Sequence, residues 1–341
     1  MRCDNLHKAK CIKNDEFYTL LSDIEKELSH YLRHFKDKIV YCNCDDPTWS
    51  AFWKYFHLNF AKLGLKKLLS THYDRENRAY KMIYTGGDDD DLSVGAVTYL
   101  NGDGDFRSPE CIELLKETDI VVTNPPFSLF REYIATLMNY QKKFLIIGGK
   151  NAITYKDFFS LLKNEKVWLG YNNVHEFLQP DGSIKKFGNI GWFTNLDITK
   201  RHEKLILSKH YDSQKYLKYD NYNAINVDKV SEIPYDYTGV MGVPITYLDK
   251  HNPEQFEILG YTSGRVEYDV LAHPTKRYVN ALQHNKDGSV SSGSKVNTRA
   301  TIIVTNPRGI YYTADNSSEK LIVLYARILI RRKQNDLFPQ T

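Results

Sequence analysis

The segment Asn124-Pro125-Pro126-Phe127 combines residue types that can hold a flat amine. It follows directly on the apolar run 119–123, which is typical of a buried strand. Each proline fixes its own φ and keeps the residue before it extended, so Asn124 and Pro125 have little conformational freedom. The side-chain oxygen of Asn124 and the backbone oxygen of Pro125 can therefore accept both hydrogens of one amino group. Phe127 offers a face on which a ring can stack.

The exocyclic amine of a purine suits such a site. Its nitrogen is a poor nucleophile, because its lone pair is delocalised into the ring. Two fixed acceptors favour the pyramidal nitrogen and stabilise the positive charge that develops as it attacks a methyl group, without a metal or a covalent intermediate. A paired base has to be flipped out of its duplex to enter. The alternative, a stiff turn that carries no chemistry, stays open at this point.

Apolar runs alternate with amphipathic segments over the first half of the chain. Strands are predicted at residues 38–42, 66–71, 97–100, 119–123, 144–147 and 167–169, and helices at 16–35, 50–63, 109–118, 128–140 and 155–164. Several of the strands are apolar throughout, which is typical of a parallel sheet covered by helices on both faces. The sequence therefore predicts an α/β fold, in which ligands bind at the carboxyl ends of the strands.

Local signals support several of these elements. Ser108 followed by Pro109 is typical of a capped helix start, and residues 154–157 have the pattern of a capping box. Gly64 is expected to end a helix. The acidic run 86–91 is predicted to be the solvated tip of a hairpin.

Composition narrows the class of protein. The chain has 341 residues, 42% of them hydrophobic, and a formal net charge of +4, so it is a globular protein for which nucleic acid is an allowed partner. It has no apolar run long enough to cross a membrane, and residues 1–13 are polar, so we expect a cytoplasmic protein. The five cysteines are expected to be reduced. We predict no metal, because Cys42 and Cys44 lack the spacing and the partners of a zinc site.

The regular alternation ends near residue 199, where Tyr, Asn, Asp, Lys and Gly become frequent. Residues 285–297 are expected to form a mobile surface loop, and residues 321–330 a single strand or helix. The domains are therefore predicted as an N-terminal cofactor-site segment and helix (1–35), a catalytic core (36–199) and a target-recognition region with a C-terminal element (200–341).

Taken together, motifs spread along the chain resemble the EcoRI-type adenine-specific DNA methyltransferases. The resemblance is carried by residues 13–19, 40–47, 102–108, 119–130, 192–196, 218–222, 239–246 and 252–256. It implies a Rossmann-like class I methyltransferase sheet with a target-recognition region. The implied activity is transfer of a methyl group from S-adenosylmethionine to the N6 amine of an adenine flipped out of duplex DNA.

The resemblance also implies roles for particular residues. It places Asp15, Phe17, Tyr18 and Thr19 at the methionine part of the cofactor, Asn43, Asp45, Asp46 and Pro47 in the cofactor loop after the first strand, Asp105 and Phe106 at the cofactor's adenine, and Asn124, Pro125, Pro126 and Phe127 at the target amine. The loop after the first strand lacks the Gly-x-Gly of many cofactor-binding sheets. Asp74 is the candidate for the acidic residue that binds the ribose hydroxyls.

We expect double-stranded DNA to be the partner and the protein to be a monomer. A restriction endonuclease that acts on the same site is a candidate second partner. Two other functions stay open. One is an amino-methyltransferase that acts on RNA or on protein glutamine, since the motif suits any planar amine. The other is a DNA-binding module that has lost its activity.

Overall fold

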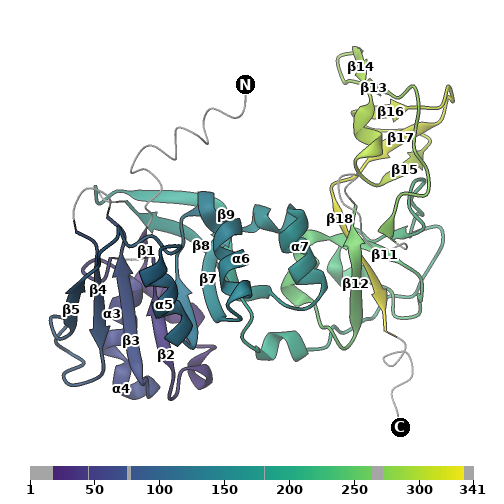
Figure 1. Cartoon of the computed structure of the whole chain (residues 1–341). Coiled ribbons are helices and arrows are strands. Elements are labelled where there is room, and N and C mark those ends of the chain that lie inside the picture. Colours follow the sequence, from purple (N-terminus) through teal and green to yellow (C-terminus); the bar gives the residue numbers. More distant parts are fainter. Residues whose placement is uncertain (1–17, 45, 75–77, 180, 263–271, 334–341) are drawn as a thin grey trace, which may run out of the picture. The chain divides into compact units, whose positions relative to one another are not determined.

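The computed structural model describes residues 18–333, apart from 45, 75–77, 180 and 263–271 (Figure 1). The chain forms two compact units, Met1–Ile198 and Thr199–Thr341. The finer division at residues 35 and 199 stays a prediction.

The first unit is built on a sheet of nine strands in the order β1-β8-β9-β7-β6-β2-β3-β4-β5. Its strands are β1 (Tyr18–Thr19), β2 (Ile39–Cys42), β3 (Lys67–His72), β4 (Tyr80–Tyr84), β5 (Ala96–Tyr99), β6 (Ile120–Thr123), β7 (Lys143–Gly149), β8 (Trp168–Leu178) and β9 (Ile184–Thr194). The four central strands, β7, β6, β2 and β3, are parallel. The α/β fold class is confirmed.

The prediction of a parallel sheet is wrong for the outer strands. The pairs β3–β4, β4–β5, β7–β9, β8–β9 and β1–β8 are all antiparallel. Strands joined by a short turn can pair only in this way, because a parallel pair needs a long crossover. The β8–β9 turn, in which Gly182 has a φ of +82°, was not predicted. The acidic run does lie between β4 and β5, as expected of a hairpin tip.

Helices cover both faces of this sheet. They are α2 (Leu21–Leu28), α3 (Ala51–Leu58), α4 (Phe60–Leu63), α5 (Pro109–Glu117), α6 (Phe130–Asn139) and α7 (Lys156–Lys163). On one face, α2, α3 and α4 pack on alternate strand residues such as Val40 and Val122. On the other face, Phe130 of α6 and Phe158 of α7 contact the ring of Phe193 at 5.3 and 5.1 Å between centroids. The central strands are therefore buried on both sides.

The helix predicted at 16–35 is divided in the structure. Its first residues, Tyr18 and Thr19, form β1 and pair with the end of β8. Helix α2 then ends at Leu28, and a short 3-10 turn, η1 (Leu32–His34), follows. The buried carboxylate of Glu27 accepts hydrogen bonds from the backbone N–H groups of Tyr171 and Asn172 at 2.8 Å. Contacts with β8 thus decide where these elements begin and end.

The predicted helix signals have mixed outcomes. The hydroxyl of Ser108 accepts from the N–H of Cys111, with Pro109 in the first turn, as predicted. Gly64 ends α4 with a φ of +65°. The capping box at 154–157 is wrong, because Thr154 closes the 3-10 turn η3 (Lys150–Thr154) and donates to the carbonyl of Asn151.

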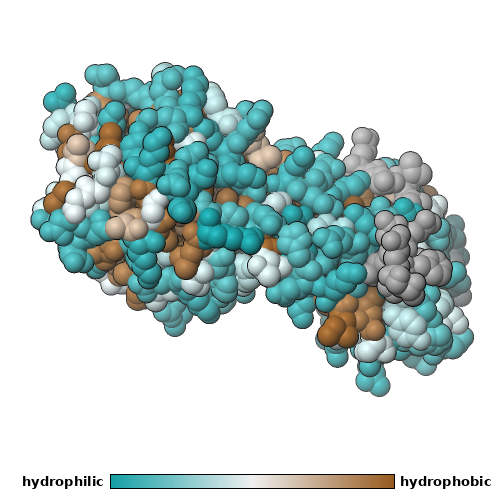
Figure 2. Space-filling model, turned by 90° about the horizontal axis from the view of Figure 1, so that it is seen from below, coloured by the Kyte–Doolittle hydropathy of each residue, from teal (hydrophilic) through white to brown (hydrophobic). Residues whose placement is uncertain are grey.

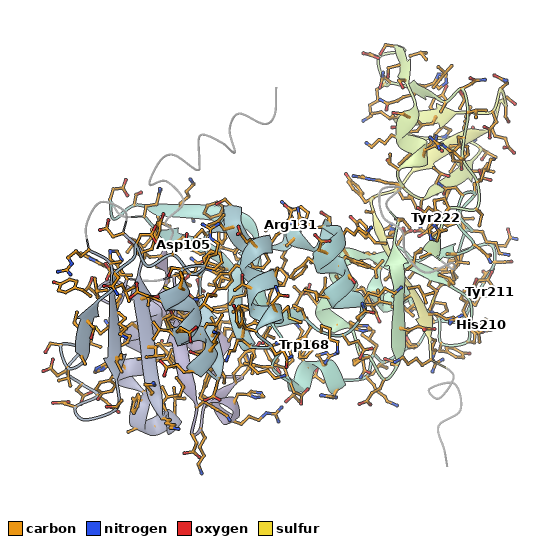
Figure 3. All side chains as sticks on the ribbon, in the orientation of Figure 1. Asp105, Arg131, Trp168, His210, Tyr211 and Tyr222 are labelled. Atoms are coloured by element: carbon orange, nitrogen blue, oxygen red, sulfur yellow. The ribbon has the colours of Figure 1, made fainter. Side chains whose placement is uncertain are left out.

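The second unit contains two smaller sheets. One has the order β10-β11-β18-β12 and the other β14-β13-β16-β17-β15. The bounds are β10 (Ile225–Asn226), β11 (Met241–Pro244), β12 (Phe256–Tyr261), β13 (Leu282–His284), β14 (Val290–Ser292), β15 (Thr301–Val304), β16 (Tyr311–Thr313), β17 (Lys320–Val323) and β18 (Arg327–Arg332). The ring of Tyr211, which precedes β10 in the sequence and is labelled in Figure 3, contacts that of Tyr237, with centroids 4.6 Å apart.

Two predictions for this unit are corrected. Residues 321–330 do not form one element, because β17 ends at Val323 and β18 begins at Arg327 in the other sheet. The segment 285–297 is largely ordered as the β13–β14 hairpin and a short 3-10 turn, η8 (Ser294–Asn297). Within the described ranges, no helix has both the length and the apolarity to cross a membrane. On the face shown in Figure 2, hydrophilic residues predominate.

Candidate active site

The carboxyl ends of β2 and β6 lie side by side at the centre of the nine-stranded sheet. Strand β2 pairs with β3 on one side and with β6 on the other. The order in which strands are added to the sheet therefore reverses between β2 and β6, and this point is the central change of direction of the sheet. Ligands of open α/β sheets bind at such a point. The register pairs Tyr41 with Val121, and its continuation by two residues places Asn43 beside Thr123, directly before Asn124.

The side chain of Asn43 is fixed by a hydrogen bond from α6, the helix that follows the motif. Asn43 is 3% exposed, and its side-chain oxygen accepts a hydrogen bond from the hydroxyl of Tyr133 on α6. Burial raises the pKa of the Tyr133 hydroxyl well above its usual value, so this hydroxyl stays protonated and donates. The ring of Tyr133 also contacts that of Phe106 edge to face, at 5.0 Å. Helix α6 therefore brings together two loops that the sequence analysis assigned to the cofactor.

The motif itself forms the turn between β6 and α6. The side-chain oxygen of Asn124 is buried, and Pro125 is buried as well. Pro126 is extended, with φ −54° and ψ 124°, and its carbonyl accepts from the N–H of Leu129. The helix predicted from residue 128 begins instead as a 3-10 turn, η2 (Phe127–Leu129), which continues into α6. The extended backbone of Asn124 and Pro125 stays a prediction.

Phe127 belongs to a cluster of three phenylalanines. Its ring lies edge to face with those of Phe177 and Phe187, at 6.0 and 6.1 Å, and these two rings are 5.5 Å apart. Phe177 lies on β8 and Phe187 on β9, so the hairpin that the sequence analysis missed supports the motif. Pairs of this kind contribute about 0.5–1.5 kcal/mol each beyond the burial of their area. The orientation of Phe127 is thus set by a distant part of the chain.

Asp105, which is labelled in Figure 3, takes part in an ion-pair network. Its carboxylate accepts from the side chain of Arg107 at 2.6 and 2.8 Å, and Arg107 also contacts Glu132 of α6 at 3.1 Å. These carboxylates raise the pKa of Arg107 above its usual value. Phe106 is 5% exposed and packs on α6. Both residues therefore have a structural role, whatever they contribute to a ligand.

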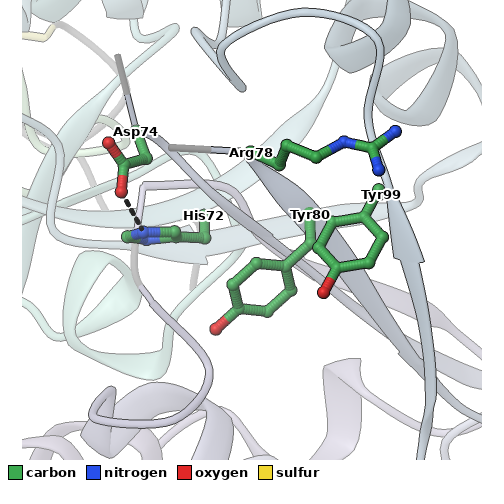
Figure 4. Close-up of a pocket in the computed structure, with 5 residues that line it drawn as sticks. All are labelled: His72, Asp74, Arg78, Tyr80 and Tyr99. Carbon is green, nitrogen blue, oxygen red and sulfur yellow. Dashed lines mark ion pairs between the residues drawn. The ribbon is translucent and has the colours of Figure 1, made fainter. Parts of the chain in front are cut away.

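A cavity of about 430 Å³ opens at the carboxyl end of β3 (Figure 4). It is lined by His72, Asp74, Arg78, Tyr80 and Tyr99. This volume lies within the range usual for small-molecule sites, about 300–1,000 Å³. Its wall combines a carboxylate with two tyrosine rings, which suits a ligand that has hydroxyl groups and a flat ring.

His72 connects two of the predicted cofactor loops. Its Nδ1 lies 3.5 Å from a carboxylate oxygen of Asp46, and its Nε2 lies 3.6 Å from one of Asp74. The other oxygen of Asp46 accepts from the hydroxyl of Tyr80 at 2.7 Å and from Thr48. The loops after β2 and β3 therefore meet at this cavity, and Asp74, the late candidate for the ribose, lines it.

The loop 102–105 packs against the same strand end. The backbone N–H of Asp74 donates to the carbonyl of Asp103. Gly104 has a φ of +77°, and a Cβ at this position would lie 2.2 Å from the carbonyl oxygen of His72. Only glycine permits this close approach.

The remaining predicted residues are less informative. Asp15, Phe17 and Asp45 lie outside the described residues. Pro47 is buried. Tyr18 and Thr19 form the edge strand β1, where Thr19 pairs with Phe177, the neighbour of Phe127. No group of three or more His, Cys, Asp or Glu side chains that could hold a metal ion occurs among the described residues.

Sequence reasoning missed His72, Tyr80 and Tyr133. His72 had a usable signal, because it follows the predicted strand 66–71 at the edge where ligands bind. Tyr133 had none, since its role depends on the packing of α6 against β2.

A sheet with this parallel centre, covered by helices on both faces and with its site at the central change of direction, defines a Rossmann-like class I methyltransferase fold. The family model described as "Adenine-specific methyltransferase EcoRI" matches residues 5–333. The chain therefore belongs to this family of adenine-specific DNA methyltransferases, which confirms the predicted family, enzyme class and function.

Individual relatives agree with this assignment. The chain is 46% identical over 321 residues to the Type II methyltransferase M.EcoRI of Escherichia coli, with 82% of this chain and 96% of that protein covered. It is 39% identical over 289 residues to M.MpnI of Mycoplasma pneumoniae, with 79% and 86% covered. No solved structure matches the chain.

Proposed function

We propose that the protein transfers a methyl group from S-adenosylmethionine to the N6 amine of an adenine that is flipped out of duplex DNA. The observation that carries this proposal is the position of Asn124, which directly follows Thr123, the residue beside Asn43, at the central change of direction of the sheet. The ends of adjacent parallel strands can hold a methyl donor and an acceptor within reach of each other.

The described residues fit the proposed cofactor. The cavity at the end of β3 has the carboxylate of Asp74 for ribose hydroxyls and the rings of Tyr80 and Tyr99 for a purine. Asp46 and His72 fix the wall of this cavity by the contacts described above. When bound, S-adenosylmethionine supplies an electrophilic methyl group on a sulfonium. Asn43, Asp105 and Phe106 are proposed to lie along the same site.

Asn124 and Pro125 carry the chemistry of the acceptor. Their two oxygens accept the two hydrogens of the adenine amine, which directs the nitrogen lone pair out of the ring plane. As the bond between nitrogen and the methyl group forms and the bond between that methyl group and the donor sulfur breaks, these oxygens would stabilise the positive charge on nitrogen until it gives one proton to water. Phe127, held by Phe177 and Phe187, provides a contact surface for the flipped base.

We further propose that the enzyme recognises a short DNA sequence and acts as a monomer in the cytoplasm. A restriction endonuclease of the same specificity is the proposed partner. The Type II designation of the relatives supports this pairing.

Transfer of a labelled methyl group from S-adenosylmethionine tests the proposal. We expect label in duplex DNA, recovered as N6-methyladenine after digestion to nucleosides, and none in RNA or protein. Label in RNA, or on protein glutamine, would favour the first rival function, and binding of DNA without any transfer would favour the second.

The variant Asn124→Ala tests the role of the motif. It should abolish turnover while duplex DNA still binds, because the substitution removes the side-chain oxygen that is proposed to accept from the amine. Asn139→Ala, at the exposed end of α6, is the matched control and should leave turnover unchanged. Full turnover in Asn124→Ala would show that this residue does not hold the target amine.

A further inference from the structure

Positive charge is concentrated in the five-stranded sheet of the second unit and in the short segment before it. Residues 276–323 contain seven Lys and Arg against three Asp and Glu, a net charge of +4. The whole chain also has a net charge of +4, so all other residues together balance to zero. A local excess of this kind indicates an anionic partner for this sheet.

Several of these charges are exposed and not neutralised by neighbours. Lys286, Lys295 and Arg308 are exposed, and within the described part of the chain none of them forms an ion pair. By contrast, Lys276 is paired with Asp220 at 3.0 Å. A surface cation without an ion pair can bind a phosphate without first breaking a contact within the protein.

One face of this sheet is covered and the other is open. Tyr312 and Leu321 are buried with Tyr278 and Val296 on the covered face. On the opposite face, Val290, His284 and Tyr311 lie in one row across β14, β13 and β16, because the register pairs Val290 with His284 and His284 with Tyr311. Val290 is 54% exposed, and Leu282, two residues from His284 on the same face, is 46% exposed.

The open face combines flat rings with cations. The rings of His284 and Tyr311 are stacked, 4.5 Å apart and within 4° of parallel. The ammonium group of Lys320 lies 5.7 Å from the centroid of the Tyr311 ring. At the end of the sheet, a Cβ at Gly309 would lie 3.1 Å from Cε of Lys286, so the β13–β14 turn and the loop with Arg308 meet. Lys286, Arg308 and Lys320 thus surround a small aromatic surface.

We propose that this open face and its turns bind duplex DNA, with Lys286, Arg308 and Lys320 on phosphates and the row Val290–His284–Tyr311 toward the base edges. This inference rests on the proposed function, which supplies duplex DNA as the substrate. Three neighbouring strands span about 10 Å. The major groove of B-DNA is about 12 Å wide and admits a β-ribbon. Phosphate contacts of this kind orient a protein on the duplex.

The test compares two triple variants of the full chain by fluorescence anisotropy with a labelled duplex at several salt concentrations. The first is Lys286→Gln, Arg308→Gln and Lys320→Gln. The control is Lys54→Gln, Lys62→Gln and Lys66→Gln, which removes the same charge from exposed positions in the first unit.

We expect the first variant to bind duplex at least tenfold more weakly than the wild type. The slope of log K against log salt should become shallower by about 0.9 for each phosphate that the variant no longer neutralises. Its affinity for S-adenosylhomocysteine, measured by calorimetry, should equal that of the wild type. The control variant should retain both the affinity for duplex and the slope.

Equal duplex binding by the first variant and the wild type, or an equally weakened binding in both variants, would overturn the inference. If the triple variant does not fold, the single change Lys286→Glu at the exposed turn is tested instead. We expect its affinity for duplex to decrease at least threefold. An unchanged affinity would contradict the inference. Equal competition by single-stranded RNA would also contradict it. A wild type that binds duplex but transfers no methyl group would refute only the proposed function.

Discussion

Tyr133 donates a hydrogen bond from its hydroxyl to the side-chain oxygen of Asn43. The two residues are far apart in sequence, and both are buried. Tyr133 lies on α6, the helix that follows the Asn-Pro-Pro-Phe turn, and Asn43 directly follows β2, the parallel neighbour of β6. This contact joins the helix after the Asn124–Phe127 turn to the loop after β2.

Removal of this hydroxyl in Tyr133→Phe leaves the buried oxygen of Asn43 with only the weak thiol donor of Cys44, at 3.8 Å, so we expect a decrease of about 1 kcal/mol or more in the free energy of unfolding. Urea denaturation measures the change. Tyr140→Phe, at the exposed end of the same helix, is the control and should lie within about 0.5 kcal/mol of the wild type. An equally stable Tyr133→Phe protein would mean that the hydrogen bond adds nothing to stability.

Truncation of Phe187 tests whether the β8–β9 hairpin positions the motif. We expect Phe187→Ala to lower kcat about tenfold, which corresponds to about 1.4 kcal/mol, because Phe127 then loses its contact with the Phe187 ring. The KM for the methyl donor should change little. Ile184→Ala, an exposed residue on the same strand, serves for comparison. If both variants have the wild-type kcat, the hairpin does not position Phe127.

Gly104→Ala places a Cβ against the backbone of His72 and forces a residue with a side chain into a φ of +77°. We expect a lower melting temperature and at least tenfold weaker binding of S-adenosylhomocysteine, since the loop 102–105 must move away from the cavity. Gly188→Ala has open space around its Cβ and is the matched control. Unchanged cofactor affinity in Gly104→Ala would separate this loop from the cofactor site.

His251 in the second unit predicts a dependence of stability on pH. Burial, with smaller contributions from Arg201 and Lys333, lowers its pKa to about 3, and its Nδ1 lies 2.9 Å from the hydroxyl of Tyr247. Because the unfolded state takes up the proton first, this histidine contributes stability above about pH 6.5 that is lost as the pH falls toward 3. We expect a larger drop in the urea midpoint between pH 7.5 and 5.5 for the wild type than for His251→Gln. Equal drops would contradict this assignment.

The sequence alone determined the features that depend on neighbouring residues. The rigidity of the Asn124–Phe127 turn follows from its two prolines, and the start of α5 follows from Ser108 and Pro109. The hairpin around the acidic run was likewise predicted from local composition. The resemblance in its motifs was specific enough to identify the family, which the match over residues 5–333 confirms.

Other features depended on contacts between residues far apart in the chain. The antiparallel outer strands, the division of residues 321–330 between two sheets and the cluster of Phe127, Phe177 and Phe187 have no local signature. Periodicity reports which face of a segment is buried, but not which strand lies beside it. The stacked pair His284–Tyr311 is formed only by the pairing of β13 with β16.

The chemistry proposed for the motif could therefore be inferred from four consecutive residues, because proline restricts the backbone wherever it occurs. The residues around the motif, from the hydroxyl of Tyr133 to the cavity at His72 and Asp74, were brought together by the tertiary structure. Their side chains become neighbours only when the parallel strands are in register and α6 packs against them. Such register is a property of the whole sheet, since each strand is positioned by the burial of all the others.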